Sequence, residues 1–77
     1  SSGNFNSNSS IKAIAYSNII SIQNITSATK VDVYSITGSL VKSMVIDSDT
    51  YFDMSHGIWV VIVKSNEGYK SFKLFTN

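Results

Sequence analysis

The sequence contains no stretch in which apolar residues recur at positions i, i+3, i+4 and i+7 over three helical turns. Its apolar set is dominated by Ile and Val, which favour strands and which alternate with polar residues in short segments. In residues 30–36, for example, Val31 and Val33 fall on one face of a strand. Asp32 and Tyr34 fall on the opposite face. These features predict an all-β fold.

Seven strand segments can be placed between turn residues. They are residues 12–16, 19–23, 30–36, 40–46, 51–54, 58–64 and 69–75. The clearest turn is Thr37-Gly38-Ser39, because Gly38 can supply the positive φ that a tight hairpin requires. Seven short strands at this spacing predict a small antiparallel Greek-key β-sandwich of the Ig-like type.

Two of these segments carry specific expectations about packing. Residues 58–63 are apolar on both faces, which is typical of a central strand that is covered on both sides. We therefore expect residues 58–63 to lie in the middle of the sandwich. In an earlier segment, the alternation places Leu40, Met44 and Ile46 on the same face as Lys42.

A chain of 77 residues without cysteine is long enough for one small domain, which no disulfide can stabilise. Residues 1–10 are Ser, Asn and Gly around a single Phe5, so they predict a flexible linker. The folded domain is expected to span residues 11–77. The core of such a domain rarely contributes more than about 3–5 kcal/mol of net stability.

Charged residues are sparse, at 14% of the chain, and the net charge is only +1. Nucleic-acid binding needs a concentrated basic surface, so this composition argues against a nucleic-acid partner. The longest apolar run, residues 58–63, is far shorter than the ~20 residues that span a bilayer. Because residues 1–10 are polar, we expect any export signal to lie upstream on a longer precursor.

The residues that most often carry chemistry form no recognisable constellation. His56 has no cysteine or second histidine at metal-ligand spacing, and we interpret it as a surface residue of a turn. Asp47, Asp49 and Asp53 lack the glycine and terminal glutamate of a calcium loop, so we interpret them as turn residues that bond nearby backbone. No serine lies in a G-x-S-x-G motif. We therefore predict no enzyme activity, no metal or cofactor, and no small-molecule substrate.

The aromatic residues allow two interpretations. The six residues concerned are Tyr34, Tyr51, Phe52, Trp59, Tyr69 and Phe75. They could form a platform that stacks on sugars. The favoured expectation is that most of them fill or edge the core, because a small sandwich needs large side chains.

Several short motifs follow one another in a fixed order. Residues 31–41 (VDVYSITGSLV) form the first, and residues 52–55 (FDMS) and 57–63 (GIWVVIV) form the next two. A turn at Gly68 and a final KLFTN at residues 73–77 complete the set. Together they resemble the C-terminal sorting domains of the type IX secretion system (Por secretion system) of Bacteroidetes. That resemblance covers roughly residues 13–77.

The resemblance implies a non-catalytic signal that directs a cargo protein through the outer-membrane translocon. It implies two kinds of partner, translocon components and a sortase-like peptidase that removes the domain in or just before residues 1–10. It also implies export through the periplasm to the outer-membrane surface or the extracellular space. The recognition residues it suggests are the last strand and tail, Lys73, Leu74, Phe75, Thr76 and Asn77. The motif residues it suggests to be architectural are Val33, Tyr34, Gly38, Gly57, Trp59, Val61 and Gly68.

Three further hypotheses stay open at this point. The sparsely charged final segment, residues 69–75, could offer an edge for backbone pairing with a receptor or for a weak homodimer. The chain could instead be an Ig-like carbohydrate- or adhesion-binding module that uses its aromatic residues. It could also be a structural accessory domain of a cell-surface protein.

Overall fold

The computed structural model describes residues 10–77, and these residues form seven antiparallel strands. In chain order they are β1 (Lys12–Tyr16), β2 (Ile19–Gln23), β3 (Thr29–Ser35), β4 (Leu40–Ile46), β5 (Thr50–Asp53), β6 (Gly57–Ser65) and β7 (Gly68–Thr76). Each predicted segment coincides with one of them to within one residue at either end. The all-β prediction is confirmed. Apart from Ser10, the predicted linker lies outside the described residues.

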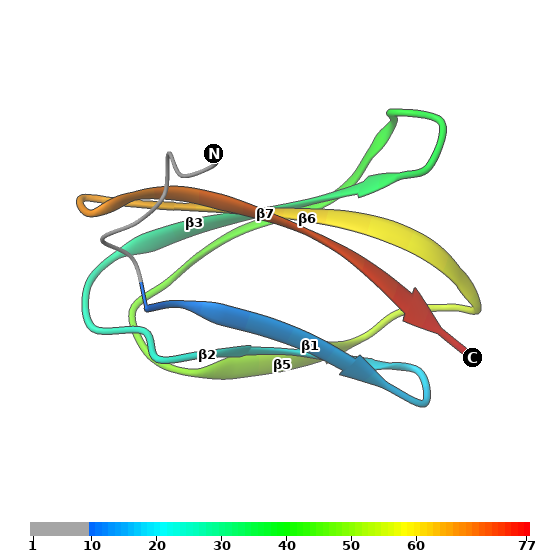
Figure 1. Ribbon diagram of the computed structural model, residues 1–77, viewed down its shortest axis with the longest axis horizontal. Helices are drawn as coiled ribbons and strands as arrows, with labels where there is room; N and C mark the ends of the chain where they lie inside the picture. The colour runs from blue at the N-terminus through cyan, green and yellow to red at the C-terminus, as the bar shows by residue number, and fades with distance from the viewer. Residues whose placement is uncertain (1–9) are drawn as a thin grey trace.

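The strands form two sheets that face each other (Figure 1). Sheet A has the order β1-β2-β5, and sheet B has the order β4-β3-β6-β7. The chain changes sheet between β2 and β3, between β4 and β5, and between β5 and β6. The arrangement is therefore a sandwich of three strands on four.

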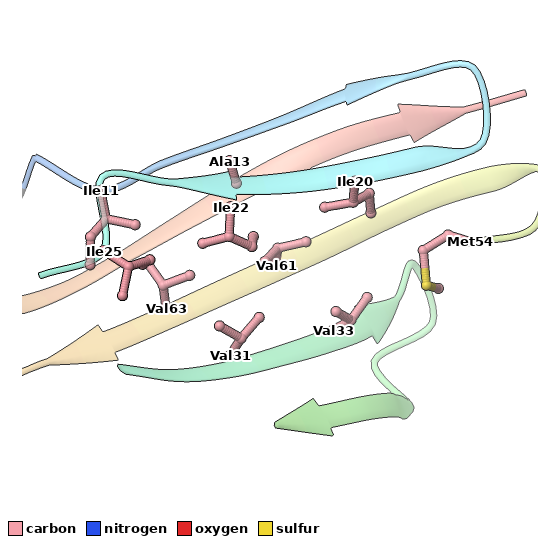
Figure 2. Packing of buried hydrophobic residues seen from close by; sticks show 10 residues of the cluster. All are labelled: Ile11, Ala13, Ile20, Ile22, Ile25, Val31, Val33, Met54, Val61 and Val63. Atoms are coloured by element: carbon pink, nitrogen blue, oxygen red, sulfur yellow. The ribbon is translucent and has the colours of Figure 1, made fainter. Parts of the chain in front are cut away.

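The core lies between the sheets and consists almost entirely of aliphatic side chains (Figure 2). Sheet A contributes Ile20 and Ile22, and sheet B contributes Val31, Val33 and neighbours from β6. Because side chains alternate across a strand, every second residue of β2 and β3 enters this layer. The fully or nearly fully buried apolar residues are Ile11, Ala13, Ile20, Ile22, Ile25, Val31, Val33, Met54, Val61 and Val63.

The expectation for residues 58–63 is half right. The strand that contains them, β6, is an interior strand of sheet B, between β3 and β7. Only Val61 and Val63 are buried, however, and the opposite face of β6 is partly exposed. The expected cover on both sides was wrong because the described residues form two layers, and neither lies over the outer face of sheet B.

The expected face of Leu40 was also wrong, and a β-bulge explains why. Val33 pairs with Lys42, but the next residue, Tyr34, pairs with Leu40, so Val41 is the extra residue. Val33 points into the core, and Tyr34 and Leu40 therefore point outward. Leu40 is 54% exposed as a result.

The β3–β4 hairpin closes through the turn that the sequence predicts. Ser35 and Ser39 are joined by a backbone hydrogen bond of 2.8 Å, and the Gly38 amide donates to the Ser35 carbonyl at 2.9 Å. Gly38 has a φ of +97°, which a residue with a side chain rarely adopts. The tip of this hairpin projects beyond the body of the sandwich, at the end where the chain terminates (Figure 1).

One seam between the sheets is closed by polar contacts from β7. The Lys70 ammonium donates to the Ile11 carbonyl at 3.2 Å, and the Asn77 amide donates to the Ser17 carbonyl at 2.8 Å. Strand β7 and the residue after it are thereby attached to the residue before β1 and to the turn that follows β1. None of residues 10–77 belongs to a helix with the length and hydropathy needed to cross a bilayer.

Candidate recognition surface

The predicted recognition tail is part of the folded sandwich, and its residues point in different directions. Leu74 packs against the core, and Thr76 is only 4% exposed. The outward positions are Lys73 and Phe75, the latter 62% exposed. The Lys73 ammonium lies 6.0 Å from the centre of the Phe75 ring. Of the five tail residues, these two present side chains on the outer face of sheet B.

Thr76 and Trp59 hold the end of β7 against the start of β6. The Trp59 indole N–H donates to the Thr76 hydroxyl at 2.9 Å, and that hydroxyl donates to the Ser55 carbonyl. Gly57 lies against the Trp59 ring, since a Cβ there would be in ordinary contact with it at 3.4 Å, and it has a φ of +157°, which a residue with a side chain rarely adopts. The structure therefore gives Gly57, Trp59 and Thr76 a shared part in fixing the tail.

Three segments that carry the sequence motifs meet on the outer face of sheet B. Tyr34 of β3 pairs with Leu40 of β4 on one side and with Val60 of β6 on the other. Val60 pairs in turn with Lys73 of β7. Residues in register on adjacent strands point to the same face, so these four side chains form one row across the sheet.

Two further residues lie next to this row, toward the end of sheet B from which the β3–β4 hairpin projects. Ile58 and Phe75 are in register on β6 and β7 and share the outer face. We name the combined set the hairpin–tail surface, and it consists of Tyr34, Leu40, Ile58, Val60, Lys73 and Phe75. It is apolar except for the Lys73 ammonium and the Tyr34 hydroxyl, and all six of its residues are partly or fully exposed.

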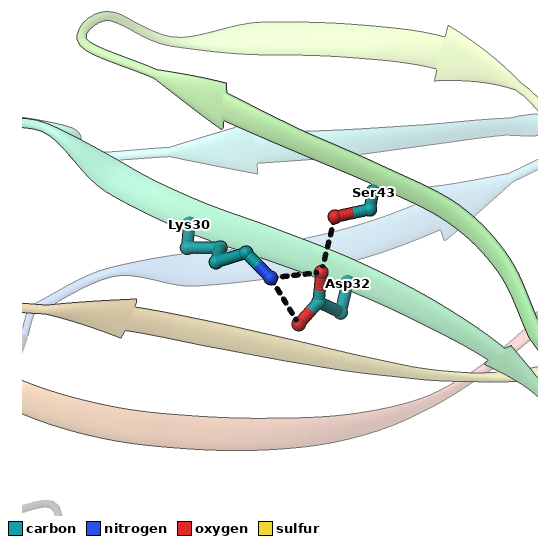
Figure 3. A network of polar contacts seen from close by, with 3 residues as sticks. All are labelled: Lys30, Asp32 and Ser43. Atoms are coloured by element: carbon teal, nitrogen blue, oxygen red, sulfur yellow. Dashed lines mark hydrogen bonds and ion pairs between the residues drawn. The ribbon is translucent and has the colours of Figure 1, made fainter.

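Beside this surface lies the one carboxylate of the outer face of sheet B, Asp32 (Figure 3). It is only 6% exposed and accepts hydrogen bonds from the Ser43 hydroxyl at 2.7 Å and from the Lys30 ammonium at 3.2 and 3.3 Å. The Ser43 hydrogen bond, with the smaller contribution of Lys30, holds the pKa of Asp32 below its ordinary value of 3.8. Burial acts in the opposite direction but does not prevail. Asp32 is therefore a stabilised anion within a mostly apolar face.

The other polar candidates lie in the segments that connect strands, except Asp53, which was predicted to be a turn residue but is the last residue of β5 and pairs with Ile19. His56 is exposed in the segment between β5 and β6, as expected. Asp49 accepts a hydrogen bond from the Ile25 amide at 2.9 Å, so it bonds a distant loop rather than its own turn. Among residues 10–77, no three His, Cys, Asp or Glu side chains come together as a group that could hold a metal.

The aromatic residues do not form one platform. Phe52 and Trp59 pack against the core, as expected, and Tyr34 is half-buried on the outer face of sheet B. The expectation that most of these six residues fill or edge the core was therefore wrong, because Tyr51, Tyr69 and Phe75 are 73%, 50% and 62% exposed. They are divided between the two outer faces, since Tyr51 lies on sheet A and the other two lie on sheet B.

The sequence reasoning missed Tyr16, which lies on the outer face of sheet A and is 64% exposed. Its side chain and that of Tyr51 contribute to an open hollow on that face. Tyr16 follows Ile14 at an interval of two in a strand, and this alternation was the signal that could have placed both on one face.

A scan against protein-family models, a search of curated proteins and a search of solved structures return no match to this chain.

Proposed function

We propose that this chain is a C-terminal sorting domain of the type IX secretion kind, and that its signal is the hairpin–tail surface. The observation that supports this most is the meeting of motif segments far apart in the sequence. Tyr34 and Leu40 come from the hairpin motif, and Lys73 and Phe75 come from the tail. In a folded signal, the recognised information is spread over such a surface rather than along one linear peptide.

The strand order supports the finer description of the fold as Ig-like. Sheets of order β1-β2-β5 and β4-β3-β6-β7, with crossings after β2, β4 and β5, suit a Greek-key sandwich. In this proposal the sandwich has a mechanical role. It presents the outer face of sheet B as a rigid unit, so that a receptor meets a preformed surface and little conformational entropy is lost on binding.

The chemistry of the surface suits a protein receptor. Leu40 and Phe75 expose large apolar side chains on the two edge strands of sheet B, with half-buried apolar neighbours between them, and such patches are typical of interaction sites. Lys73 adds a single positive charge, which can fix the orientation of a partner that carries an acidic residue. We propose a component of the outer-membrane translocon as that partner.

The proposed removal of the domain by a sortase-like peptidase also fits the packing at the start of β1. Ile11 is 4% exposed, and its carbonyl accepts the hydrogen bond from Lys70. The Asn24 side-chain amide donates to the Ser10 carbonyl at 3.0 Å. Cleavage N-terminal to Ser10 would therefore leave the sandwich and all of its described contacts intact.

The test is a secretion assay in a host with a functional type IX system, with an exported reporter fused ahead of residue 10. We expect the unmodified domain to deliver the reporter to the cell surface. The double variant Leu40→Ser/Phe75→Ser removes the two most exposed apolar groups of the hairpin–tail surface and is expected to abolish delivery. The matched control is Tyr51→Ser, which alters an even more exposed residue on the other sheet and is expected to deliver normally.

Two results would contradict the proposal. One is retention of the reporter in the periplasm with the unmodified domain, when a known cargo is delivered in the same cells. The other is normal delivery by Leu40→Ser/Phe75→Ser. Circular dichroism of the purified variants separates loss of recognition from loss of fold.

A further inference from the structure

The outer face of sheet A carries an open hollow of about 360 Å³, which is within the range of small-ligand sites. We call it the tyrosine hollow, and it is lined by Ile14, Tyr16, Ile19, Ser21, Gln23 and Tyr51. It lies on the sheet opposite the hairpin–tail surface. An inference about it does not depend on the proposed sorting function.

The register of sheet A explains how the hollow is built. Ile14, Ser21 and Tyr51 form one row across β1, β2 and β5. The adjacent row consists of Tyr16, Ile19 and Asp53. The two tyrosines thus stand on the outermost strands, on either side of a floor provided by β2. Since neighbouring strands lie about 4.8 Å apart, the backbones of these two strands are separated by roughly 10 Å.

The side chains of the hollow combine apolar surface with neutral hydrogen-bonding groups. Ile14 and Ile19 provide the apolar part, and Ser21 and Gln23 provide a hydroxyl and an amide. The Gln23 amide donates to the Ser21 hydroxyl at 3.5 Å, which is a long hydrogen bond that a ligand hydroxyl can replace without large cost. None of the six lining residues carries a charge. Lys12, in register with Gln23, and Asp53, in register with Ile19, lie at opposite corners of the same face and carry opposite charges. The hollow therefore has no net charge and favours a neutral ligand over a phosphate, a sulfate or a uronic acid.

Tyr16 and Tyr51 restrict the ligand class further. They are 64% and 73% exposed, and an exposed tyrosine offers an apolar ring face together with a hydroxyl. A pyranose ring has the complementary form, with C–H groups on its face and hydroxyls around its edge. We propose that the tyrosine hollow binds a neutral hexose oligosaccharide, with sugar rings against Tyr16 and Tyr51 and hydroxyls bonded to Ser21 and Gln23.

The test is an NMR titration of the isotope-labelled chain with four soluble probes of this class, the hexamers of β-1,4-glucose, α-1,4-glucose, β-1,3-glucose and β-1,4-mannose. We expect at least one probe to shift the amide signals of β1, β2 and β5 and to leave those of β7 unchanged. Tyr16→Ala and Tyr51→Ala should each weaken binding by about tenfold, in line with the loss of one aromatic contact. Both residues are exposed, so these variants are expected to keep the fold.

The control variant is Phe75→Ala, which removes an exposed aromatic ring from sheet B and should not change saccharide affinity. A hexaproline peptide and a hexamer of galacturonic acid serve as competing probes of other chemistry. The inference is overturned if none of the four neutral hexamers binds, or if only the peptide or the acidic hexamer binds. It is equally overturned if saccharide binding is unchanged by both tyrosine substitutions.

Discussion

The two outer faces of the sandwich are built on the same alternating pattern but differ in what they leave at the surface. On sheet A, the outward positions of β2 are Ile19, Ser21 and Gln23, so polar groups lie within an open hollow. On sheet B, the outward positions of β6 are mostly aliphatic, and the neighbouring carboxylate of Asp32 is bonded by Ser43 and Lys30 within the same face. A polar group on an apolar face therefore needs partners from the protein, whereas one in an open hollow can use water.

The largest loss of stability should come from removing the carboxylate of Asp32. Asp32→Ala leaves the Ser43 hydroxyl and the Lys30 ammonium without their acceptor, and we expect it to lower the free energy of unfolding by about 2 kcal/mol. Urea denaturation followed by circular dichroism measures this change. The matched variant on the other face, Ser21→Ala, should change the free energy by no more than about 0.5 kcal/mol. Equal losses from the two variants would contradict the comparison.

A somewhat smaller loss of stability is expected when the inward residue Thr76 of β7 is changed. Thr76→Val keeps the shape of the side chain but removes the hydroxyl that Trp59 and Ser55 share, and should cost about 1–1.5 kcal/mol. Ser71→Ala, at an exposed outward position of the same strand, is the control and should have almost no effect. The indole N–H signal of Trp59 in an NMR spectrum should move in the first variant alone. If it stays in place, Thr76 does not hold the tail as described.

The stability of the fold should also depend on pH through Asp32. The pKa of Asp32 is lowered in the folded state, first by the Ser43 hydrogen bond and then by Lys30. Its contribution is therefore fully present above the unfolded value near 3.8 and is lost as the pH falls through the lower folded value. Free energies of unfolding measured from pH 7 to pH 2 should show this loss of stability, and the loss should be smaller in Ser43→Ala. A loss of the same size in Asp32→Asn would show that other groups cause it.

The smallest effects on stability are expected at the most exposed residues of both faces. Phe75→Ser and Tyr51→Ser each remove a ring that is mostly in water, so each should change the free energy of unfolding by about 0.5 kcal/mol or less. The same denaturation measurement checks both. A loss above 1.5 kcal/mol at either position would mean that the ring is packed more closely than its exposure indicates.

Much of this architecture could be predicted from local sequence, because alternation and turn residues are local signals. The β3–β4 hairpin with Gly38 and the strand character of residues 58–64 follow directly from them. Inward Leu74 and outward Lys73 follow from the same alternation. The division of the tail could therefore have been foreseen once β7 was assigned.

The rest depends on contacts between residues far apart in the chain. The outward position of Leu40 results from a bulge in the pairing of β3 with β4, and no local pattern marks where a bulge falls. The outer face of β6 is uncovered because the fold has only two layers in the described residues, and the apolar sequence of β6 does not indicate the number of layers. Likewise, Tyr16 and Tyr51 share a hollow only because β2 pairs with both β1 and β5.

In the proposed function, the sorting signal is a folded surface rather than a linear tail. The most direct measurement compares two reporters in the same type IX host, one fused to residues 10–77 and the other fused to residues 68–77 alone. The account predicts surface delivery by the first and none by the second, because Tyr34, Leu40 and Val60 are missing from the shorter fusion. Delivery of both reporters with equal efficiency would contradict it.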